Sequence, residues 1–458
     1  MRVFKFGGSS LCDAEAIGRV IDILQEKSIE EKPLCVVVSA MGGVTDEIIR
    51  TAKAASHREI AYRETLKALR KRHTKVLNAI AHGDRETTEI IQEQCVEFFG
   101  ICDGVYALGE LSGKVLDRLM SFGELCSAHM VAAACRHAGL DAKFVDSRDY
   151  IVTDERYGAA RVDFEKTAAA LHKLDADGAT IHVLPGFVAR SANGRITTLG
   201  RNGSDYSAAI IGAGLGASAV EIWTDVNGVM TANPRYVSDA ESIERMSYVE
   251  AMELSHFGAH VLHAPTLQPV MEKTIPLLVR NTFSPDFKGT IVGNESVSER
   301  IITGISTVDN VSFIRVQGSG MVGVFGVAGR LFTSLAKAEV NLIMISQGSS
   351  EHSICFAVQD ADNQKAVQAI ETEFELEMQA HMMDTPVVER EMCVLAVVGE
   401  NMRRRPGIAA NVFGSLGESG VNVVAIAQGS SELNISMVIL QQDASKALNA
   451  IHSAFFKK

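Results

Sequence analysis

The chain has 458 residues, of which 47% are hydrophobic and 22% are charged, and its formal net charge is −12. This composition is typical of a globular protein, and the length suggests two to four domains. The negative charge disfavours general binding to nucleic acid or to an anionic membrane, but it leaves room for a local basic pocket that holds phosphate.

Eight cysteines are scattered along the chain without a CxxC pair. This pattern indicates reduced thiols packed in a reducing compartment. The chain starts directly on its first predicted strand without a signal pattern, and its apolar runs are too short to span a bilayer. We therefore expect a cytoplasmic protein that does not enter a membrane.

The first predicted strand, Arg2–Phe6, leads into Gly7-Gly8-Ser9-Ser10, and a helical pattern begins near Asp13. After such a strand, the backbone N–H groups of a glycine turn can point at an anion, and Lys5 can reach the same anion. The alternative is a tight strand–helix turn beside an ordinary surface lysine. The turn alone does not decide between the two, because short glycine motifs recur by chance.

A second unit of the same kind follows, with an apolar strand at Leu34–Ser39 and a glycine turn at Ala40–Thr45. Apolar strands that alternate with helices predict an α/β fold, with a mostly parallel sheet sandwiched by helices. Ligands bind beyond the carboxyl ends of such strands, where both glycine turns are expected to lie.

The remaining pattern of this half alternates helices with strands. Residues 51–119 are mostly helical and more charged, which indicates a solvated helical excursion. The further predicted strands are Lys143–Val145, Thr180–Leu184, Arg195–Thr198, Ala219–Trp223 and Ile275–Val279. The predicted helices include Ala14–Lys27, Leu125–His137, Ser204–Gly212 and Met246–Val270.

The C-terminal part contains an internal repeat. Residues 325–351 align without a gap onto residues 406–432, at a constant offset of 81 residues, as from Gln347 to Gln428. Each copy predicts strand, helix, strand, strand and helix, so the repeat indicates two copies of one α+β module. In the first copy, the helix is expected to place Phe325 and Leu331 on one apolar stripe.

Three further stretches carry groups suited to ligand binding. Glu124 stands at the expected start of a helix, where capping is the alternative role. The stretch Thr197–Asp205 places Arg201 beside two glycines, and Arg grips a carboxylate through two parallel hydrogen bonds. Its alternative is a capped helix with Ser204 as the cap. The stretch Trp223–Arg235 is either a plain strand-end turn or a nucleotide contact.

Together these stretches resemble an aspartokinase of the amino-acid-kinase superfamily over nearly the whole chain. The repeated modules resemble paired ACT domains, and the phrase around Gln347 is most similar to the threonine-sensitive aspartokinases fused to homoserine dehydrogenase. The chain stops at Lys458, so we expect no dehydrogenase part. The matching motifs are residues 3–10, 39–45, 121–124, 197–205, 223–235 and 257–263.

The resemblance implies that the chain transfers the ATP γ-phosphoryl group to L-aspartate, with Mg²⁺ bridging the phosphates. This reaction gives ADP and 4-phospho-L-aspartate, and it opens the biosynthesis of lysine, threonine and methionine. The implied catalytic residues are Lys5 and Asp205. The implied aspartate-binding residues are Ser39, Thr45, Glu124, Arg201 and Ser204. The implied ATP-binding residues are Lys5, Gly7, Gly8, Ser9, Thr224, Asp225, Met230, Arg235, His260 and Val261.

The resemblance also implies feedback regulation through the ACT domains. We expect threonine as the effector, with lysine as the alternative, and a homodimer or dimer of dimers formed through these domains. The expected domains are residues 1–290, 301–385 and 386–458, and the strand Ile301–Thr307 is expected to complete the second module. The implied effector-binding residues are Asn341, Gln347, Asn422 and Gln428.

Two positions depart from the family pattern. His260 stands where a second phosphate-binding lysine is usual, and Met230 stands where a tyrosine is frequent. A neutral imidazole supplies little charge at pH 7. We therefore expect an activity that is lowered, or that rises as the pH falls toward ~6.

Alternative functions stay open from the sequence. Residues 318–323 match GxGxxG after a strand, which would suit a dinucleotide-binding oxidoreductase, although a lone match is weak. His256, His260 and His263 hint at a metal site without a recognised spacing. Two closer alternatives are another acyl-phosphate-forming amino-acid kinase and a weakly active amino-acid sensor.

Overall fold

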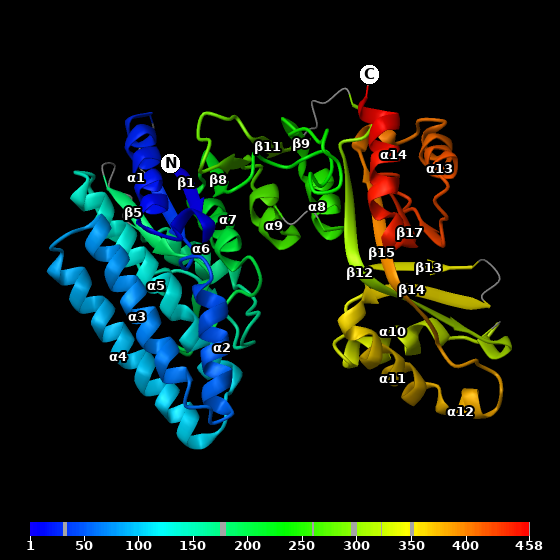
Figure 1. Ribbon diagram of the computed structural model, residues 1–458, viewed down its shortest axis with the longest axis horizontal. Coiled ribbons are helices and arrows are strands. Elements are labelled where there is room, and N and C mark those ends of the chain that lie inside the picture. The colour runs from blue at the N-terminus through cyan, green and yellow to red at the C-terminus, as the bar shows by residue number, and fades with distance from the viewer. Residues whose placement is uncertain are drawn as a thin grey trace. The chain divides into compact units, whose positions relative to one another are not determined.

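The computed structural model describes residues 1–30, 34–174, 180–258, 261–294, 300–321, 323–348 and 352–457. The chain divides into two compact units, which are drawn as ribbons in Figure 1. The first unit comprises residues 1–229 and 265–294, and the second comprises residues 230–264 and 295–458. Residues 230–264 thus cluster with the C-terminal modules, and the end of the catalytic domain stays a prediction.

The first unit is built on a mostly parallel sheet, as the sequence predicts. Within this unit the strand order is β3-β5-β2-β1-β8-β10-β11, and only β11 runs antiparallel to its neighbour β10. The strands are β1 (Arg2–Phe6), β2 (Leu34–Val38), β3 (Ala142–Phe144), β5 (Ile181–Pro185), β8 (Ala219–Thr224), β10 (Leu277–Asn281) and β11 (Thr290–Gly293).

Helices cover both faces of this sheet. Helix α5 packs on β2, β3 and β5, whereas α7 packs on β1, β2 and β8. The helices are α1 (Ala14–Glu30), α2 (Val44–Ser56), α3 (Tyr62–Ile80), α4 (Arg85–Leu108), α5 (Gly113–His137), α6 (Phe164–Leu171), α7 (Gly203–Leu215) and α9 (Ala264–Glu272). The short 3₁₀ helices η1 (Ser9–Leu11) and η2 (Ser147–Asp149) follow β1 and β3.

Strand β1 shows how the sequence sorts side chains between the two faces. Phe4 and Phe6 belong to the large core formed with α1 to α5. Val3 points the other way, because a Cβ added to Gly212 on α7 would lie 3.8 Å from its Cγ2 atom. Since side chains alternate along a strand, Lys5 shares the face of Val3 and is directed toward α7.

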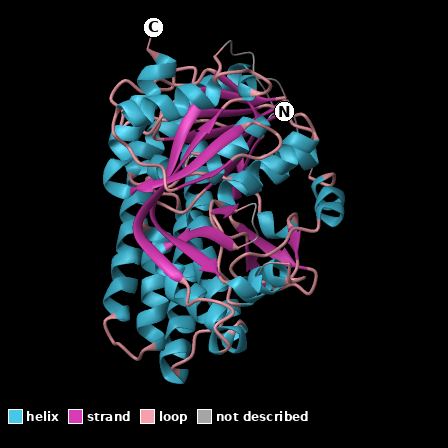
Figure 2. Cartoon of the chain, turned by 90° about the vertical axis from the view of Figure 1, so that its right-hand side faces the viewer, coloured by secondary structure: helices cyan, strands magenta, loops and turns pink. Residues whose placement is uncertain are grey.

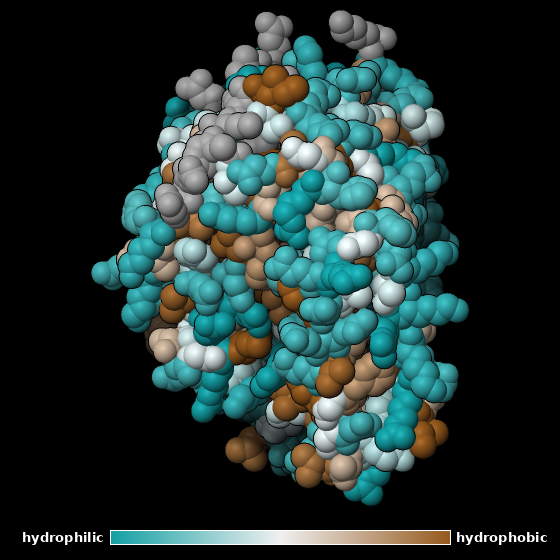
Figure 3. Space-filling model, turned by 90° about the vertical axis from the view of Figure 1, so that its left-hand side faces the viewer, coloured by the Kyte–Doolittle hydropathy of each residue, from teal (hydrophilic) through white to brown (hydrophobic). Residues whose placement is uncertain are grey.

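The helical excursion is confirmed in α3 and α4. Tyr62, Leu66 and Leu69 turn into the core, while most of the other side chains on α3 are exposed. The corresponding side of the first unit is mostly hydrophilic in Figure 3. These helices therefore protect one side of the core and present charged groups to water.

Two predicted elements are wrong. The strand at 195–198 does not join the parallel sheet; β7 (Ile196–Thr198) pairs antiparallel with β6 (Val188–Ser191) in a separate sheet that also holds β4 (Val152–Thr153). A short polar hairpin allows this pairing, which strand pattern alone does not reveal.

The helix predicted over 246–270 is interrupted. The structure has β9 (Arg245–Ser247), then α8 (Tyr248–His256), and a new helix, α9, at Ala264. Gly258 ends the first helix because its φ is +96°, and a Cβ there would lie 2.1 Å from the carbonyl oxygen of Thr307. Glycine alone fits this close approach without strain.

The second unit contains both repeated modules in the predicted order of elements. Its antiparallel sheet has the strand order β13-β14-β12-β15-β17-β16. The first module is β12 (Gly304–Gln317), α10 (Val327–Lys337), β13 (Met344–Gln347), β14 (Ser353–Gln359) and α11 (Asn363–Glu373), followed by the short α12 (Glu375–Gln379). The second is β15 (Val387–Val398), α13 (Ile408–Glu418), β16 (Ala425–Ala427), β17 (Asn434–Leu440) and α14 (Ala444–Phe456).

Strand β12 belongs to both modules. Its first half, residues 304–308, pairs with residues 394–398 of β15, and Ile305 lies in the core of the second module. Its second half pairs with β14, and Ile314 and Val316 lie in the core of the first module. Figure 2 shows the strands as a strongly curved layer flanked by helices. The segment expected to complete the second module does so from residue 304 onward.

The expected apolar stripe of the first repeat is wrong at one position. Leu331 is buried on α10, but Phe325 precedes the helix and is fully exposed. Gly326 caps the helix with a φ of +86°, so the chain turns away before Phe325 can join the core. None of the helices within the described ranges combines the length and the hydropathy that crossing a bilayer requires.

Candidate functional site

The two glycine turns meet at one edge of the parallel sheet. Strands β1 and β2 run parallel, so Gly8 and Gly42 both follow a carboxyl end. A Cβ added to Gly42 would lie 3.0 Å from the carbonyl oxygen of Gly8, and one added to Gly8 would lie 3.1 Å from that of Ala40. The absence of side chains therefore lets the two backbones touch.

One predicted backbone contact needs correction. The N–H of Gly7 donates to the carbonyl oxygen of Trp223, at an N···O distance of 3.1 Å, so it continues the strand pairing and is not free for a phosphate. The N–H groups of Gly8 and Ser9 have no hydrogen-bond partner among the described residues. An anion at this turn would therefore meet these two donors.

Lys5 and Asp205 form an ion pair beside the turn. The Nζ atom of Lys5 lies 2.5 Å from Oδ1 of Asp205, and about one tenth of each side chain is exposed. Asp205 stands in the first turn of α7, which packs on the face of the sheet that Lys5 occupies. The carboxylate therefore holds the ammonium group at the carboxyl edge of the strands.

Glu124 is not at a helix start, as the sequence suggests, but in the middle of α5. The capping role is thus wrong, and the cause is Gly123, which resembles a helix break. Gly123 is there for packing, because a Cβ on it would lie 2.7 Å from that of Ala40. The close contact brings Glu124 against the second glycine turn.

The environment of Glu124 is unusual for a carboxyl group. Burial raises its pKa to about 8, although a backbone hydrogen bond from Ala40 opposes this rise. The residue is 3% exposed, and its Oε2 atom has no hydrogen-bond partner in the part of the chain that the structure describes. A buried acceptor without a partner is costly, so the site is suited to a ligand that brings a donor or a positive charge.

Arg201 lies in the turn before α7, between two residues in the left-handed region. Gly200 has a φ of +81°, and Asn202, which caps the helix, has a φ of +51°. Helix α7 therefore begins at Gly203, and the alternative role of Ser204 as its cap is wrong. The Arg201 guanidinium is exposed and makes no hydrogen bond or ion pair with another side chain or backbone group within the described ranges. It remains available to a carboxylate.

One pocket of about 510 Å³ unites these groups. All five predicted aspartate-binding residues line it, together with Gly8 from the first turn. Sequence reasoning missed Gly158, Met120 and Phe187, which also line it. Of these, only Phe187 carries a hint in the sequence, since it follows the Pro185-Gly186 pair; in the structure its φ is +66°. The predicted lining residues are Ser39, Thr45, Glu124, Arg201 and Ser204.

The pocket is lined by both the cationic guanidinium of Arg201 and the buried carboxyl group of Glu124. A zwitterionic amino acid matches this arrangement, because its α-carboxylate would pair with Arg201 and its ammonium with Glu124. The hydroxyl groups of Ser39, Thr45 and Ser204 add further hydrogen-bond partners. Gly8 also lines the pocket, so the same ligand would lie near the phosphate turn.

The predicted nucleotide residues are divided between the units. Thr224 ends β8 in the first unit, where its hydroxyl bonds to the exposed Asp225 at 3.2 Å. In the second unit, Met230 forms an isolated bridge with Ser242, Arg235 is exposed and Val261 is half-buried. His260 lies outside the described residues.

The predicted effector residues flank two corresponding strands. Asn341 and Gln347 lie around β13, and Asn422 and Gln428 lie around β16; all four are exposed. The two strands are neighbours, because the hydroxyl of Ser346 donates to the carbonyl oxygen of Ile426 at 3.1 Å. The repeat thus brings both copies of the motif to one place.

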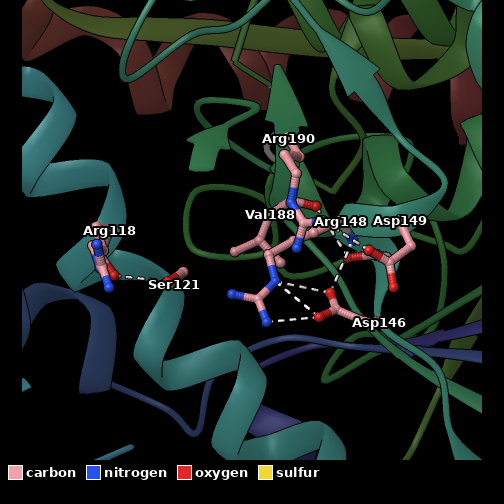
Figure 4. A network of polar contacts seen from close by, with 8 residues as sticks. Arg118, Ser121, Asp146, Arg148, Asp149, Val188 and Arg190 are labelled. Atoms are coloured by element: carbon pink, nitrogen blue, oxygen red, sulfur yellow. Dashed lines mark hydrogen bonds and ion pairs between the residues drawn. The ribbon is translucent and has the colours of Figure 1, made fainter. Parts of the chain in front are cut away.

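A second cavity, of about 160 Å³, lies on the other side of α5 and is lined by Arg118 and Arg148. These cations are already paired: Arg148 grips Asp146, as Figure 4 shows, and Arg118 lies 2.6 Å from Glu97. Figure 4 also shows the Ser121 hydroxyl turned to the carbonyl of Arg118. We therefore infer that this network stabilises the fold and is not a binding site for an anion.

The described residues do not support two of the alternatives, a dinucleotide site and a histidine metal site. The GxGxxG turn follows β12, whose neighbours are antiparallel, whereas dinucleotide binding requires a parallel βαβ unit. Gly318 and Gly320 are needed because Met382 packs against both. His256 bonds to the carbonyl of Ile343, and no group of three metal-ligating side chains occurs among the described residues.

Comparisons with known proteins agree with this geometry. A model of the amino acid kinase family matches residues 1–281, and a model of the ACT domain matches residues 314–374 and 395–455. The chain is 37% identical over 468 residues to the chloroplastic bifunctional aspartokinase/homoserine dehydrogenase of Daucus carota, covering 99% of this chain and 50% of that protein. It therefore spans about half the length of the bifunctional relatives.

Two further similarities extend over most of both proteins. The chain is 30% identical over 465 residues to chloroplastic aspartokinase 3 of Arabidopsis thaliana, covering 99% of this chain and 81% of the relative. Among solved structures, E. coli aspartokinase III with aspartate and ADP matches over the full length of both chains, with a TM-score of 0.86 at 28% identity. The same enzyme with lysine and aspartate matches with a TM-score of 0.79.

Proposed function

Because the chain belongs to the aspartokinases of the amino acid kinase family, we propose that it transfers the γ-phosphoryl group of ATP to the β-carboxylate of L-aspartate. An oxygen of the β-carboxylate attacks the γ-phosphorus, and the bond from that phosphorus to the oxygen bridging to ADP breaks. The products are 4-phospho-L-aspartate and ADP. The attacking carboxylate is already ionised, so no proton has to be removed.

The observation that carries the proposal is that the pocket holds one acidic and one basic group, the carboxyl group of Glu124 and the guanidinium of Arg201. Among the described residues, Oε2 of Glu124 is buried without a hydrogen-bond partner, and the Arg201 guanidinium makes no hydrogen bond or ion pair. An aspartate held by its α-amino and α-carboxylate groups would satisfy both. Its β-carboxylate would then be directed toward Gly8, where the phosphate turn begins.

The chemistry at the phosphate turn is positioning and charge neutralisation. We propose that Lys5 and the free N–H groups of Gly8 and Ser9 hold the phosphates of ATP. Asp205 would keep the ammonium of Lys5 in place during transfer. Thr224, Asp225, Met230, Arg235, His260 and Val261 stay proposed nucleotide contacts.

Mg²⁺ is part of the proposal because it neutralises charge on the triphosphate when it is bound. This use of the ion does not require a dedicated cage of protein side chains, and Lys5 with the N–H groups of Gly8 and Ser9 would bind the phosphates that carry it. Mg²⁺ prefers to keep waters and to bind phosphate oxygens with few protein ligands. The chain's own residues would therefore bind the phosphates, and few of them would bind Mg²⁺ directly.

Regulation by an amino acid is proposed for the paired ACT domains. The motif around Gln347 favours threonine by its resemblance, and the solved E. coli enzyme with lysine makes lysine the alternative. Asn341, Gln347, Asn422 and Gln428 are the proposed contacts. Their amide groups can bond to both charged groups of a small zwitterion.

We propose that the ACT domains also join two copies of the chain. Val324 and Phe325 are consecutive residues in the turn before α10, and their relative exposures are 50% and 101%. Ile345 and Ile426 are also exposed on the adjacent strands β13 and β16. Burying such side chains against a second copy would remove apolar area from water. Sedimentation of the wild type and of Phe325→Glu tests this, with dissociation expected for the variant.

A coupled ADP-release assay tests the activity. We expect ADP release that depends on L-aspartate, together with a hydroxylamine-trappable acyl phosphate. Release that depends on another amino acid would favour a different acyl-phosphate-forming kinase. Aspartate or effector binding without turnover would favour the weakly active sensor.

A further inference from the structure

Asp117 is a buried carboxylate that the proposed reaction does not use. It lies on α5, seven residues before Glu124, and is 1% exposed. Seven residues are close to two helical turns, so both side chains extend from the same side of the helix, about 10 Å apart along its axis. Asp117 does not line the pocket, whereas Glu124 does.

The carboxylate of Asp117 accepts hydrogen bonds from two separate segments. Oδ1 lies 2.9 Å from the backbone nitrogen of Gly158 and 3.0 Å from the hydroxyl of Thr198. Oδ2 lies 2.9 Å from the backbone nitrogen of Thr198. Burial raises the pKa of Asp117, and these donors act against that rise by favouring the charged form. Asp117 thus ties helix α5 to both segments at once.

The two segments that Asp117 holds, at Gly158 and at Thr198, belong to the wall of the pocket around Arg201. Gly158 lines the pocket itself, and a Cβ added to Gly200 would lie 3.2 Å from the carbonyl oxygen of Gly158. The N–H of Ala160 donates to the carbonyl oxygen of Thr198, which closes the link between the segments. Thr198 is the last residue of β7, and Arg201 follows it by three residues.

We propose that Asp117 is a positioning residue for the amino-acid substrate, acting through Arg201. Helix α5 serves as a rigid spacer: Glu124 meets the ligand directly, and Asp117 holds the loop that brings the guanidinium to the opposite side. The distance between the two binding groups is therefore set by one helix. This inference rests on the proposed function, because it takes the pocket as the aspartate site.

A double-mutant cycle tests the inference. Asp117→Asn keeps one acceptor oxygen but loses the charge, and we expect it to raise KM for aspartate about tenfold while KM for ATP changes less than about twofold. In an Arg201→Ala background, the same substitution should add less than about twofold, because the group that it positions is gone. Thr198→Val removes only one hydroxyl and should give a smaller rise in the same direction.

Asp163→Asn is the matched control. Asp163 caps α6, accepting from the backbone nitrogen of Lys166 at 3.0 Å, so its loss should lower stability without changing KM for aspartate. Equal effects of Asp117→Asn in both backgrounds, or equal rises in both KM values, would overturn the inference. If Asp117→Asn does not fold, Thr198→Val in the same two backgrounds decides. Failure of the wild type to use aspartate would instead contradict the proposed function.

Discussion

The ammonium nitrogen of Lys5 lies 2.5 Å from Oδ1 of Asp205, although 200 residues separate them along the chain. The contact joins the first strand of the sheet to the first turn of the helix that covers it. It holds a positive charge beside the free N–H groups of the first glycine turn. Lys5 is therefore the buried cation of the proposed phosphate site.

The first prediction concerns this ion pair. Lys5→Met should lower kcat roughly 10²–10³-fold, because a preorganised donor at the moving phosphoryl group is lost. Asp205→Asn should lower kcat less, since it leaves the ammonium present but poorly oriented. Lys166→Met is the matched control, as it breaks an exposed pair with Asp163, and neither residue lines the pocket. Steady-state ADP release decides, and an unchanged kcat for Lys5→Met would refute the assigned role.

The second prediction is proton release on aspartate binding. Burial raises the pKa of Glu124 to about 8, so its carboxyl group is mostly protonated at pH 7 in the free protein. An ammonium group favours the charged form, so binding should expel close to one proton at pH 7 and fewer above pH 8. Titration calorimetry in two buffers of different ionisation enthalpy measures this. Equal heats in both buffers for the wild type would contradict it; Glu124→Gln should release no proton.

The same group predicts a pH dependence of stability. The pKa of Glu124 is raised from 4.5 in the unfolded chain, so the folded form holds the extra proton between those two values. The free energy of unfolding should therefore fall as the pH rises from 4.5 to about 8. Glu124→Gln should flatten this part of the profile, whereas the exposed Glu165→Gln should not. Chemical denaturation across this pH range, without ligand, provides the measurement.

A further prediction separates two glycines that both lie inside helices. Gly123→Ala should destabilise the fold by about 1–3 kcal/mol, because the new Cβ would lie 2.7 Å from that of Ala40. It should also weaken aspartate binding by moving Glu124. Gly18→Ala on α1 meets nothing within 4 Å and should stabilise by about 0.5–1 kcal/mol. Thermal unfolding of both variants, with shifts of opposite sign expected, provides the test.

The last prediction uses the internal repeat as its own control. Gln347 and Gln428 occupy corresponding positions of the repeat: Gln347 ends β13, and Gln428 directly follows β16. Gln347→Ala should raise the effector concentration for half-inhibition about tenfold, because one good hydrogen-bond partner is lost. Gln428→Ala should shift it less. Titrations with threonine and with lysine identify the effector, and wild-type sensitivity of Gln347→Ala to both would exclude this residue from the site.

The local sequence was sufficient for the elements around the glycine turns. Local sequence alone is enough to recognise the apolar strands β1 and β2 and the glycines that follow each of them. The same is true of the repeat, because a constant offset of 81 residues needs no structure to be seen. Glu124 shows the limit: Gly123 resembles a helix break, and only packing against Ala40 explains why the helix continues through it.

The amino-acid sequence by itself determined the α/β pattern, the duplicated module and the types of residue in the pocket, because these follow from periodicity and from short motifs. Tertiary structure alone decided that Glu124 is buried with an oxygen that has no partner among the described residues, that the Gly7 N–H is already used, and that Asp117 accepts hydrogen bonds from Gly158 and Thr198. The physical reason is that burial, free hydrogen-bonding groups and long-range contacts depend on which distant segments pack together. Local sequence pattern does not carry that information.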